Sequence, residues 1–302
     1  MFDLITNKSK NCGVYQFGCR LNKILWDQGV NNKYYECEDL NTFSKIKKKS
    51  KIILFNFINA SRPTAPLKWL TQDIINELKL KGHIVGVLEH SDDLKYQFDF
   101  IVHQNPLKYS NNNLTIPRPL FYDFDNIPFK KVDNISTEIL KRKKLIFGSF
   151  GLAFNNKGFD KIIHKINNEF ESAIIRMHII KANYNDSNGS FHEKVIKYLK
   201  SIKLKNNVSL KISTNFLSDP ELLSFLNKND VNILNYQNTH QENDDGSLSS
   251  AVDHAISSRK PFSVSSSHQF KHIDRALTIE SNSLFEIISN GSYYNDKYLK
   301  LW

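Results

Sequence analysis

Several hydroxyl side chains and a glycine stand together in the stretch DDGSLSS, from Asp244 to Ser250. This stretch precedes a predicted helix, and a helix N-terminus favours anions because it carries unpaired backbone N–H groups and about half a positive charge. Gly246 would let the backbone approach a ligand closely, and the hydroxyls of Ser247, Ser249 and Ser250 would donate hydrogen bonds. The segment predicts an anion site, with N-capping as the alternative role for one of these serines.

A second anion-suited stretch, GSFGLAFNNKGFDKII, runs from Gly148 to Ile163. A predicted strand ends in its Gly-Ser-Phe-Gly turn, and Lys157 with Gly158 opens the next helix. A lysine at a helix start can bind a phosphate by adding a point charge to the helix dipole. The stretch is neither a Walker loop nor a GxGxxG fingerprint, so by itself it fits a solvated lysine as well. Two such helix starts at strand ends of one sheet strengthen the anion interpretation.

A third set of candidate residues lies in the first half of the chain. Gly13 and Gly18 flank a helix start in NCGVYQFGCRL, and Glu89 and His90 end a predicted strand in VLEHSDD. A histidine at a strand end commonly has a structural role. One that faces a ligand could instead position or polarise a reacting group, so both interpretations stay open.

The elements that must position these residues are strands and helices in strict alternation. In the first half, apolar runs predict strands, and helical periodicity predicts helices near Tyr15–Gln28 and Pro66–Lys81. The predicted strands there are FDLIT, KIILFNFI, HIVGVLEH and FDFIVHQ. The second half predicts strands at KLIFGSF, SAIIRMHII, NVSLKIS, VNILNY and PFSVSS. Its predicted helices lie near Lys157–Glu169, Phe191–Lys203, Pro220–Lys228 and Ser247–Ser258.

Continuous apolar strands that alternate with helices predict an α/β fold with parallel sheets and helices on both faces. A Pro- and Asp-rich stretch, TIPRPLFYDFDNIPFKKVDN, separates the two series and suits a connection between domains around residues 117–140. We therefore predict two Rossmann-like domains, residues 1–130 and residues 131–302.

Composition limits the partners that the chain can have. The net charge of +10 divides evenly between residues 1–130 and the remainder, which argues against a dedicated nucleic-acid-binding arm. An anionic substrate or an anionic membrane surface remains compatible with it. The lysine clusters at 45–51 and 141–144 fit either solvated loops or contact with phosphates or lipid. Three cysteines without paired spacing, and no signal peptide or spanning run, indicate a cytoplasmic protein that is soluble or peripheral at the membrane.

The chain resembles the GT-B glycosyltransferases, most of all the large retaining family numbered 4 in the carbohydrate classification. FGSFGLAFNNKGFD is similar to the start of that family's donor domain, and FLSDPELLSFLNKNDVNILNY is similar to its segment before the donor site. GSLSSAVDHAISSRKPFSVSSSHQFKHI resembles its region of two glutamates followed by Ala-Met-Ala and Gly-Lys-Pro. RALTIESNSLFEIISN resembles the closing strand and helix, and CGVYQFG resembles the glycine-containing acceptor-side loop.

The resemblance implies a cleft between the two domains and an enzyme that moves a sugar from a nucleoside-diphosphate donor, with retention of configuration and no metal or other cofactor. The acceptor would be a glycan, a lipid-linked molecule or a protein. It implies a catalytic role for His90, which falls where the family keeps a cleft histidine. The implied donor-binding residues are Gly13, Lys157, Gly246, Ser247, Ser249, Ser250, Asp253 and His254.

The sequence departs from the family pattern at the two glutamates. The second aligns with His254, preceded by Asp253, and the first aligns near Gly246. Either Asp253 or His254 would then contact the ribose, and alignment favours His254. These departures keep an alternative open, in which the protein binds nucleotide-sugars or glycans without catalysis.

Overall fold

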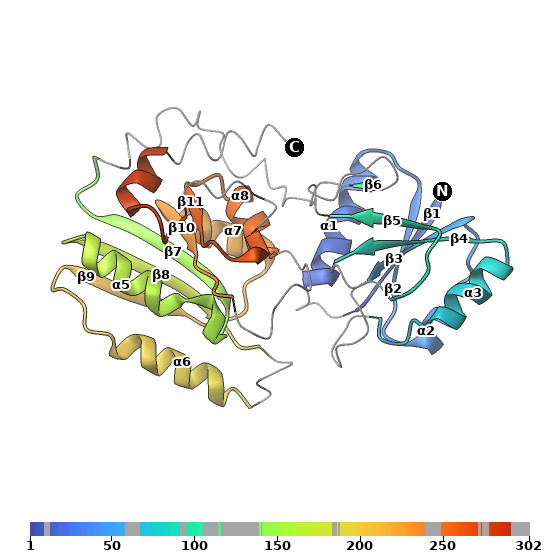
Figure 1. Ribbon diagram of the computed structural model, residues 1–302, viewed down its shortest axis with the longest axis horizontal. Helices are drawn as coiled ribbons and strands as arrows, with labels where there is room; N and C mark the ends of the chain where they lie inside the picture. Colours follow the sequence, from blue (N-terminus) through green and yellow to red (C-terminus); the bar gives the residue numbers. More distant parts are fainter. Residues whose placement is uncertain are drawn as a thin grey trace. The chain divides into compact units, whose positions relative to one another are not determined.

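The structure is a computed structural model of the 302-residue chain. It describes residues 1–8, 13–57, 67–90, 95–104, 114–115, 139, 141–182, 186, 188–238, 249–270, 273 and 278–290. The chain divides into two compact units, one built on each of two parallel sheets (Figure 1). The predicted connection around residues 117–140 lies almost entirely outside the described residues. No helix in the described part of the chain is long and apolar enough to cross a bilayer.

The first sheet has the strand order β2-β1-β3-β4-β5-β6, and all its paired strands are parallel. Its strands are β1 (Phe2–Thr6), β2 (Asn32–Glu36), β3 (Ile52–Phe57), β4 (Ile84–Glu89), β5 (Phe100–His103) and β6 (Leu114–Thr115). Its helices are α1 (Gly13–Asp27), α2 (Leu40–Ser44) and α3 (Gln72–Leu80). Side chains of α2 and α3 pack on one face, and Phe17 of α1 packs on the other with Leu4 and Leu88. This confirms the predicted parallel sheet with helices on both faces.

The second sheet has the order β11-β10-β7-β8-β9 and is also parallel. Its strands are β7 (Leu145–Leu152), β8 (Ala173–Ile180), β9 (Val208–Ser213), β10 (Val231–Leu234) and β11 (Phe262–Val264). Its helical segments are η3 (Asn155–Lys157), α5 (Phe159–Glu169), α6 (Ser190–Ser201), α7 (Asp219–Asn227), α8 (Ala251–Ser257), η4 (His268–Phe270) and residues 284–290. Side chains of α5, α6 and residues 284–288 form one apolar core, and those of α7 and α8 form another.

Two differences from the predicted elements have local physical reasons. The helix predicted from Pro66 begins at Gln72, because the Thr71 side chain caps it by accepting from the amide of Ile74 at 3.4 Å. The edge strand β2 was not predicted: its sequence, NKYYE, has no continuous apolar run, and four of its five side chains are only half-buried.

Candidate functional site

The strand order of the second sheet reverses between β7 and β10. From β7 the chain adds β8 and β9 on one side, and it then returns to place β10 and β11 on the other. Ligands of open parallel sheets bind outside the carboxyl ends of the strands at such a switch point. The residues that follow β7 and β10 therefore form the first candidate site.

At Gly158, the segment that follows β7 packs closely against the segment that follows β10. Gly158 has a left-handed backbone, with φ of 56° and ψ of 31°, and it is the N-cap residue of α5, directly after Lys157. A Cβ atom at this position would lie 2.3 Å from the carbonyl oxygen of Asn235, which follows β10. The amide of Gln237 also donates to the carbonyl oxygen of Asn156 at 2.7 Å. Glycine is thus required by both backbone geometry and close approach.

Lys157 is half-buried, and its ammonium lies 3.4 Å from the centroid of the Tyr236 ring. From the sequence alone, Lys157 could also be a solvated lysine. In the structure its side chain lies on the face of the Tyr236 ring. Such a cation–π contact contributes roughly 0.5–2 kcal/mol, depending on how far the cation is desolvated. Lys157 is therefore a positioned cation at the switch point.

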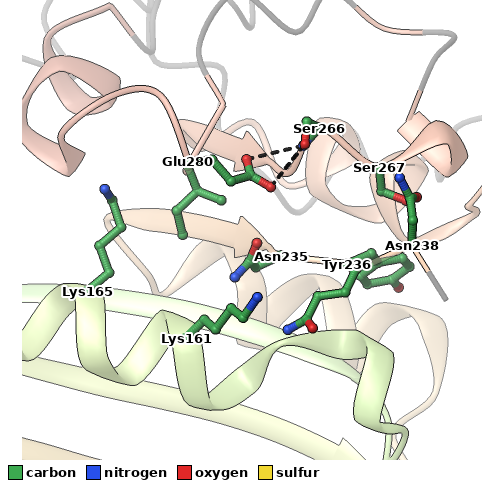
Figure 2. A pocket seen from close by; sticks show the side chains of 10 residues that line it. Lys161, Lys165, Asn235, Tyr236, Asn238, Ser266, Ser267 and Glu280 are labelled. Atoms are coloured by element: carbon green, nitrogen blue, oxygen red, sulfur yellow. Dashed lines mark hydrogen bonds between the residues drawn. The ribbon is translucent and has the colours of Figure 1, made fainter.

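A pocket of about 420 Å³ opens beside these residues (Figure 2). The residues that line it include Lys161, Lys165, Asn235, Tyr236, Ser266 and Glu280. Figure 2 shows the two lysines reaching into the pocket from α5, with Ser266 and Glu280 on the other side. Both carboxylate oxygens of Glu280 accept from the amide of Ser266 at 3.1 Å, which fixes that side chain.

The charges at the pocket differ in how far they are compensated. Lys165 pairs with Glu169 at 2.9 Å, whereas Lys161 is exposed and makes no ion pair within the described residues. Lys161 and Lys165 are four residues apart in α5 and so lie on one face of that helix, whereas Lys157 ends η3, just before the helix. No group of three or more His, Cys, Asp or Glu side chains in the described ranges could hold a metal ion. The site can attract an anion with its ammonium groups and bind hydroxyls with Glu280 and Asn235.

A different polar cluster lies at the switch point of the first sheet, between β1 and β3. The side-chain nitrogen of Asn56 in β3 donates to the carbonyl oxygen of Val14 at 2.6 Å and to Thr6 Oγ1 at 2.9 Å. Asn56 Oδ1 lies 2.5 Å from Nε2 of His90. Because the Val14 oxygen can only accept, Oδ1 must face His90, and Nε2 must carry a hydrogen. Glycine at position 18 provides the space that the Asn56 side chain needs, because a Cβ there would lie 2.6 Å from the Asn56 side-chain nitrogen.

His90 is further held by Phe17, whose ring meets it edge-on with centroids 4.9 Å apart. Next to it, Glu89 and His103 are both buried, with Oε2 and Nδ1 2.6 Å apart. The carboxyl edge of the first sheet is thus lined by polar groups that contact one another.

Comparison with known proteins identifies the architecture. No protein-family model matches the chain, and no curated protein sequence does. Solved structures do: HepE of Anabaena in complex with UDP and glucose has a TM-score of 0.60 at 8% identity, over 99% of this chain and 94% of that chain. An alpha-glucosyltransferase in complex with UDP and a 13-mer DNA has a TM-score of 0.56 at 10% identity. The match covers 98% of this chain and 92% of that chain.

The fold is GT-B. A third structure is similar at 12% identity and a TM-score of 0.54, namely the N-terminal domain of Candida albicans trehalose-6-phosphate phosphatase, over 99% of this chain and 92% of that chain. These likenesses extend over nearly the whole chain, so both parallel sheets take part in the GT-B match. The predicted fold class is confirmed.

Within this GT-B fold, two of the predicted donor-binding serines, Ser249 and Ser250, lie at the start of α8, which follows β10. Ser249 Oγ accepts from the amide of Ala251 at 3.3 Å, so this serine satisfies the first amide of the helix. Ser250 occupies the N-cap position without a side-chain capping bond. Gly246 and Ser247 lie outside the described residues.

The two candidates for a ribose contact are both buried in the second unit. Asp253 is 1% exposed and His254 is 4% exposed. His254 Nδ1 lies 3.1 Å from the carbonyl oxygen of Ser250 and must donate to it, and Nε2 lies 3.8 Å from Asp219 Oδ1. A ribose hydroxyl could reach Nε2 only beside that carboxylate and after its surroundings had shifted.

The first GT-B unit holds the remaining predicted residues. Gly13 is the exposed first residue of α1, one residue before Val14, whose carbonyl oxygen accepts from Asn56. His90 is bonded to the same asparagine, so Gly13 is the chain neighbour of one member of the cluster that holds His90. Lys157 and the α8 residues belong to the other unit.

Sequence reasoning missed Asn56, Lys161, Tyr236 and Glu280. Two of them left a signal in the sequence. Lys161 follows Lys157 by one turn of the predicted helix, and Tyr236 comes two residues after the apolar strand β10, next to the switch point. Asn56 lies inside an apolar strand and Glu280 lies far along the chain. Nothing in their local sequence separates them from structural residues.

Proposed function

We propose that this protein is a glycosyltransferase that moves a sugar from a nucleoside-diphosphate donor to an acceptor hydroxyl. The observation that carries the proposal is the lysine-lined pocket at the switch point of the second sheet of a GT-B fold. UDP-sugars are the first donors to test, because similar GT-B structures contain UDP, or UDP-glucose in the case of HepE.

The donor diphosphate is proposed to bind near Lys157 and Lys161, with the backbone before α8 as a further contact through Gly246 and Ser247. Lys157 is already held on the Tyr236 ring, so little side-chain freedom is lost when it binds a phosphate. Hydroxyls of the donor would bind Glu280 and Asn235. In this scheme the Glu280 carboxylate binds the donor hydroxyls that the family's two glutamates, absent here, would bind.

The reaction breaks the bond between the anomeric carbon and a diphosphate oxygen, and the acceptor oxygen forms the new bond and loses its proton. Negative charge grows on the departing nucleoside diphosphate, and ammonium groups already in place stabilise it without reorganisation. Transfer with retention and without a metal is the form we propose. Activity should then survive EDTA, and loss that a divalent ion restores would contradict the metal-free scheme.

His90 is the catalytic candidate of the first unit. Because Asn56 holds the hydrogen on Nε2, the Nδ1 nitrogen is the one that accepts. A ring nitrogen that accepts can take a hydrogen bond, or a proton, from a sugar or acceptor hydroxyl.

A thermal-shift screen of nucleoside diphosphates and their sugars tests the proposal first. A specific donor should raise the melting temperature by mass action, and release of the sugar from UDP-glucose, into water or onto an acceptor, should follow. A shift without any sugar release would favour the non-catalytic binding protein. No shift with any nucleotide would contradict both functions.

A further inference from the structure

Exposed apolar side chains gather at the amino edge of the first sheet. Of the large hydrophobic side chains that are exposed in the described residues, most lie there: Met1, Trp26, Val30, Leu80 and Ile84. Leu80 is 89% exposed and Trp26 is 73% exposed. Elsewhere the described residues expose only Leu40, Tyr198, Phe216 and Phe285 in this way. A single exposed apolar residue is ordinary, but a group at one edge indicates a contact surface.

The parallel topology explains why these residues share the amino edge, although α1 and α3 lie on opposite faces of the sheet. Each helix that connects parallel strands must return the chain to the amino edge, so α1 ends there with Trp26 and α3 ends there with Leu80. Val30 and Ile84 lie at or just before the first residues of β2 and β4, and the register places Asn32, Phe2, Ile52 and Ile84 side by side.

Lysines interrupt this apolar group. Lys47, Lys49 and Lys51 lead into β3 and are exposed, and the carbonyl oxygen of Lys51 accepts from the amide of Ile84 at 2.8 Å. Lys48 between them turns inward, where its ammonium donates to the Phe43 carbonyl oxygen at 3.1 Å, and burial lowers its pKa. We call Trp26, Val30, Leu80 and Ile84 with Lys47, Lys49 and Lys51 the amino-edge face.

The acids nearby do not cancel these charges. Glu77 pairs with Lys81, and Asp99 pairs with Lys79 at 3.0 Å, so each acid already has its own cation. Asp27, next to Trp26, is the remaining exposed acid at the end of α1. The three lysines of the amino-edge face therefore leave an excess of positive charge.

We propose that the amino-edge face binds the surface of an anionic lipid bilayer. An indole and aliphatic side chains suit the headgroup boundary, where Trp is enriched, and the lysines complement anionic headgroups. A nucleic acid would match the lysines but would leave Leu80 and Ile84 without apolar contacts. The inference is independent of the donor site, because every residue of the face lies in the first unit.

The test is co-sedimentation with vesicles of phosphatidylcholine alone and of phosphatidylcholine mixed with phosphatidylglycerol. The protein should bind the anionic vesicles, with a blue shift of tryptophan fluorescence that Trp26→Phe removes. A variant with Lys47→Gln, Lys49→Gln and Lys51→Gln should bind at least tenfold more weakly, because each lysine near such a surface contributes about fivefold. A matched control carries the same change at Lys194, Lys197 and Lys200, three exposed lysines of α6, and should bind normally.

The apolar part of the face is tested by the Trp26→Ser, Leu80→Ser variant against Phe216→Ser, which removes an exposed aromatic from the other unit. The first should lose most of the binding and the second should keep it. Equal binding by the lysine variant and its control would overturn the proposal. So would tight binding to duplex DNA that Trp26→Ser leaves unchanged.

Discussion

The two sheets have the same parallel design but different side chains at their switch points. In the first, Asn56 uses its amide nitrogen on Val14 and Thr6 and its oxygen on His90, so the polar groups satisfy one another. In the second, Lys161 lines a pocket and Lys157 lies on the ring of Tyr236, which also lines it; no described residue forms an ion pair with Lys161.

This difference divides two tasks within one chain. A neutral network fixes a side chain and its tautomer but brings no net charge, which suits the orientation of a reacting group. Ammonium groups at a pocket attract an anion and stabilise charge that grows during a reaction. We therefore propose orientation of a reacting group for the first unit and anion binding for the second.

The largest expected effect comes from Gly158→Ala. The substitution places a Cβ against the Asn235 carbonyl and forces alanine into a left-handed backbone, so we expect the free energy of unfolding to fall by about 3 kcal/mol. Chemical denaturation measures it. Gly189→Ala is the control: φ there is 79°, but the Cβ would meet only the flexible Lys181 side chain, at 3.3 Å. Equal losses for both would show that the close approach to Asn235 contributes nothing.

A smaller loss is expected in the first unit from Asn56→Leu. The change leaves Val14 and His90 without their buried partner, and we expect about 2 kcal/mol of destabilisation. The nitrogen chemical shifts of His90 should show a hydrogen on Nε2 in the wild type and a mixture of tautomers in the variant. A wild-type ring protonated only at Nδ1 would contradict the network.

The smallest expected effect is a loss of stability of the second sheet at acid pH. Burial lowers the pKa of His178 in β8, so the unfolded chain takes up a proton at a higher pH than the folded one. The contribution of the neutral His178 to the free energy of unfolding is fully present above the pKa of the unfolded chain, about 6.5. It is lost as the pH falls from there toward the lower pKa of the folded protein. Hydrogen exchange of the β8 amides at pH 5 and pH 8 measures this. His178→Asn should flatten the difference, whereas the same change at the exposed His164 should not.

The sequence predicted the sheets well because their strands are continuous apolar runs, such as KIILFNFI, that are buried on both faces. It selected Lys157 and His90 as candidates because each comes soon after a predicted strand. It could not find Asn56, whose role depends on Val14 and His90, at positions far from it in the chain. It also could not foresee that Asp253 and His254 are covered, since burial of a polar helix residue depends on packing that no local pattern encodes.

Calorimetric titration with UDP tests the central claim, that the switch point of the second sheet binds the donor diphosphate. We expect Lys157→Ala to weaken UDP binding by roughly 10- to 100-fold, the loss of one charge-assisted contact. Lys194→Ala, which removes an exposed lysine of α6, should bind UDP as the wild type does. Equal UDP affinity in all three proteins, with the fold intact, would contradict the account.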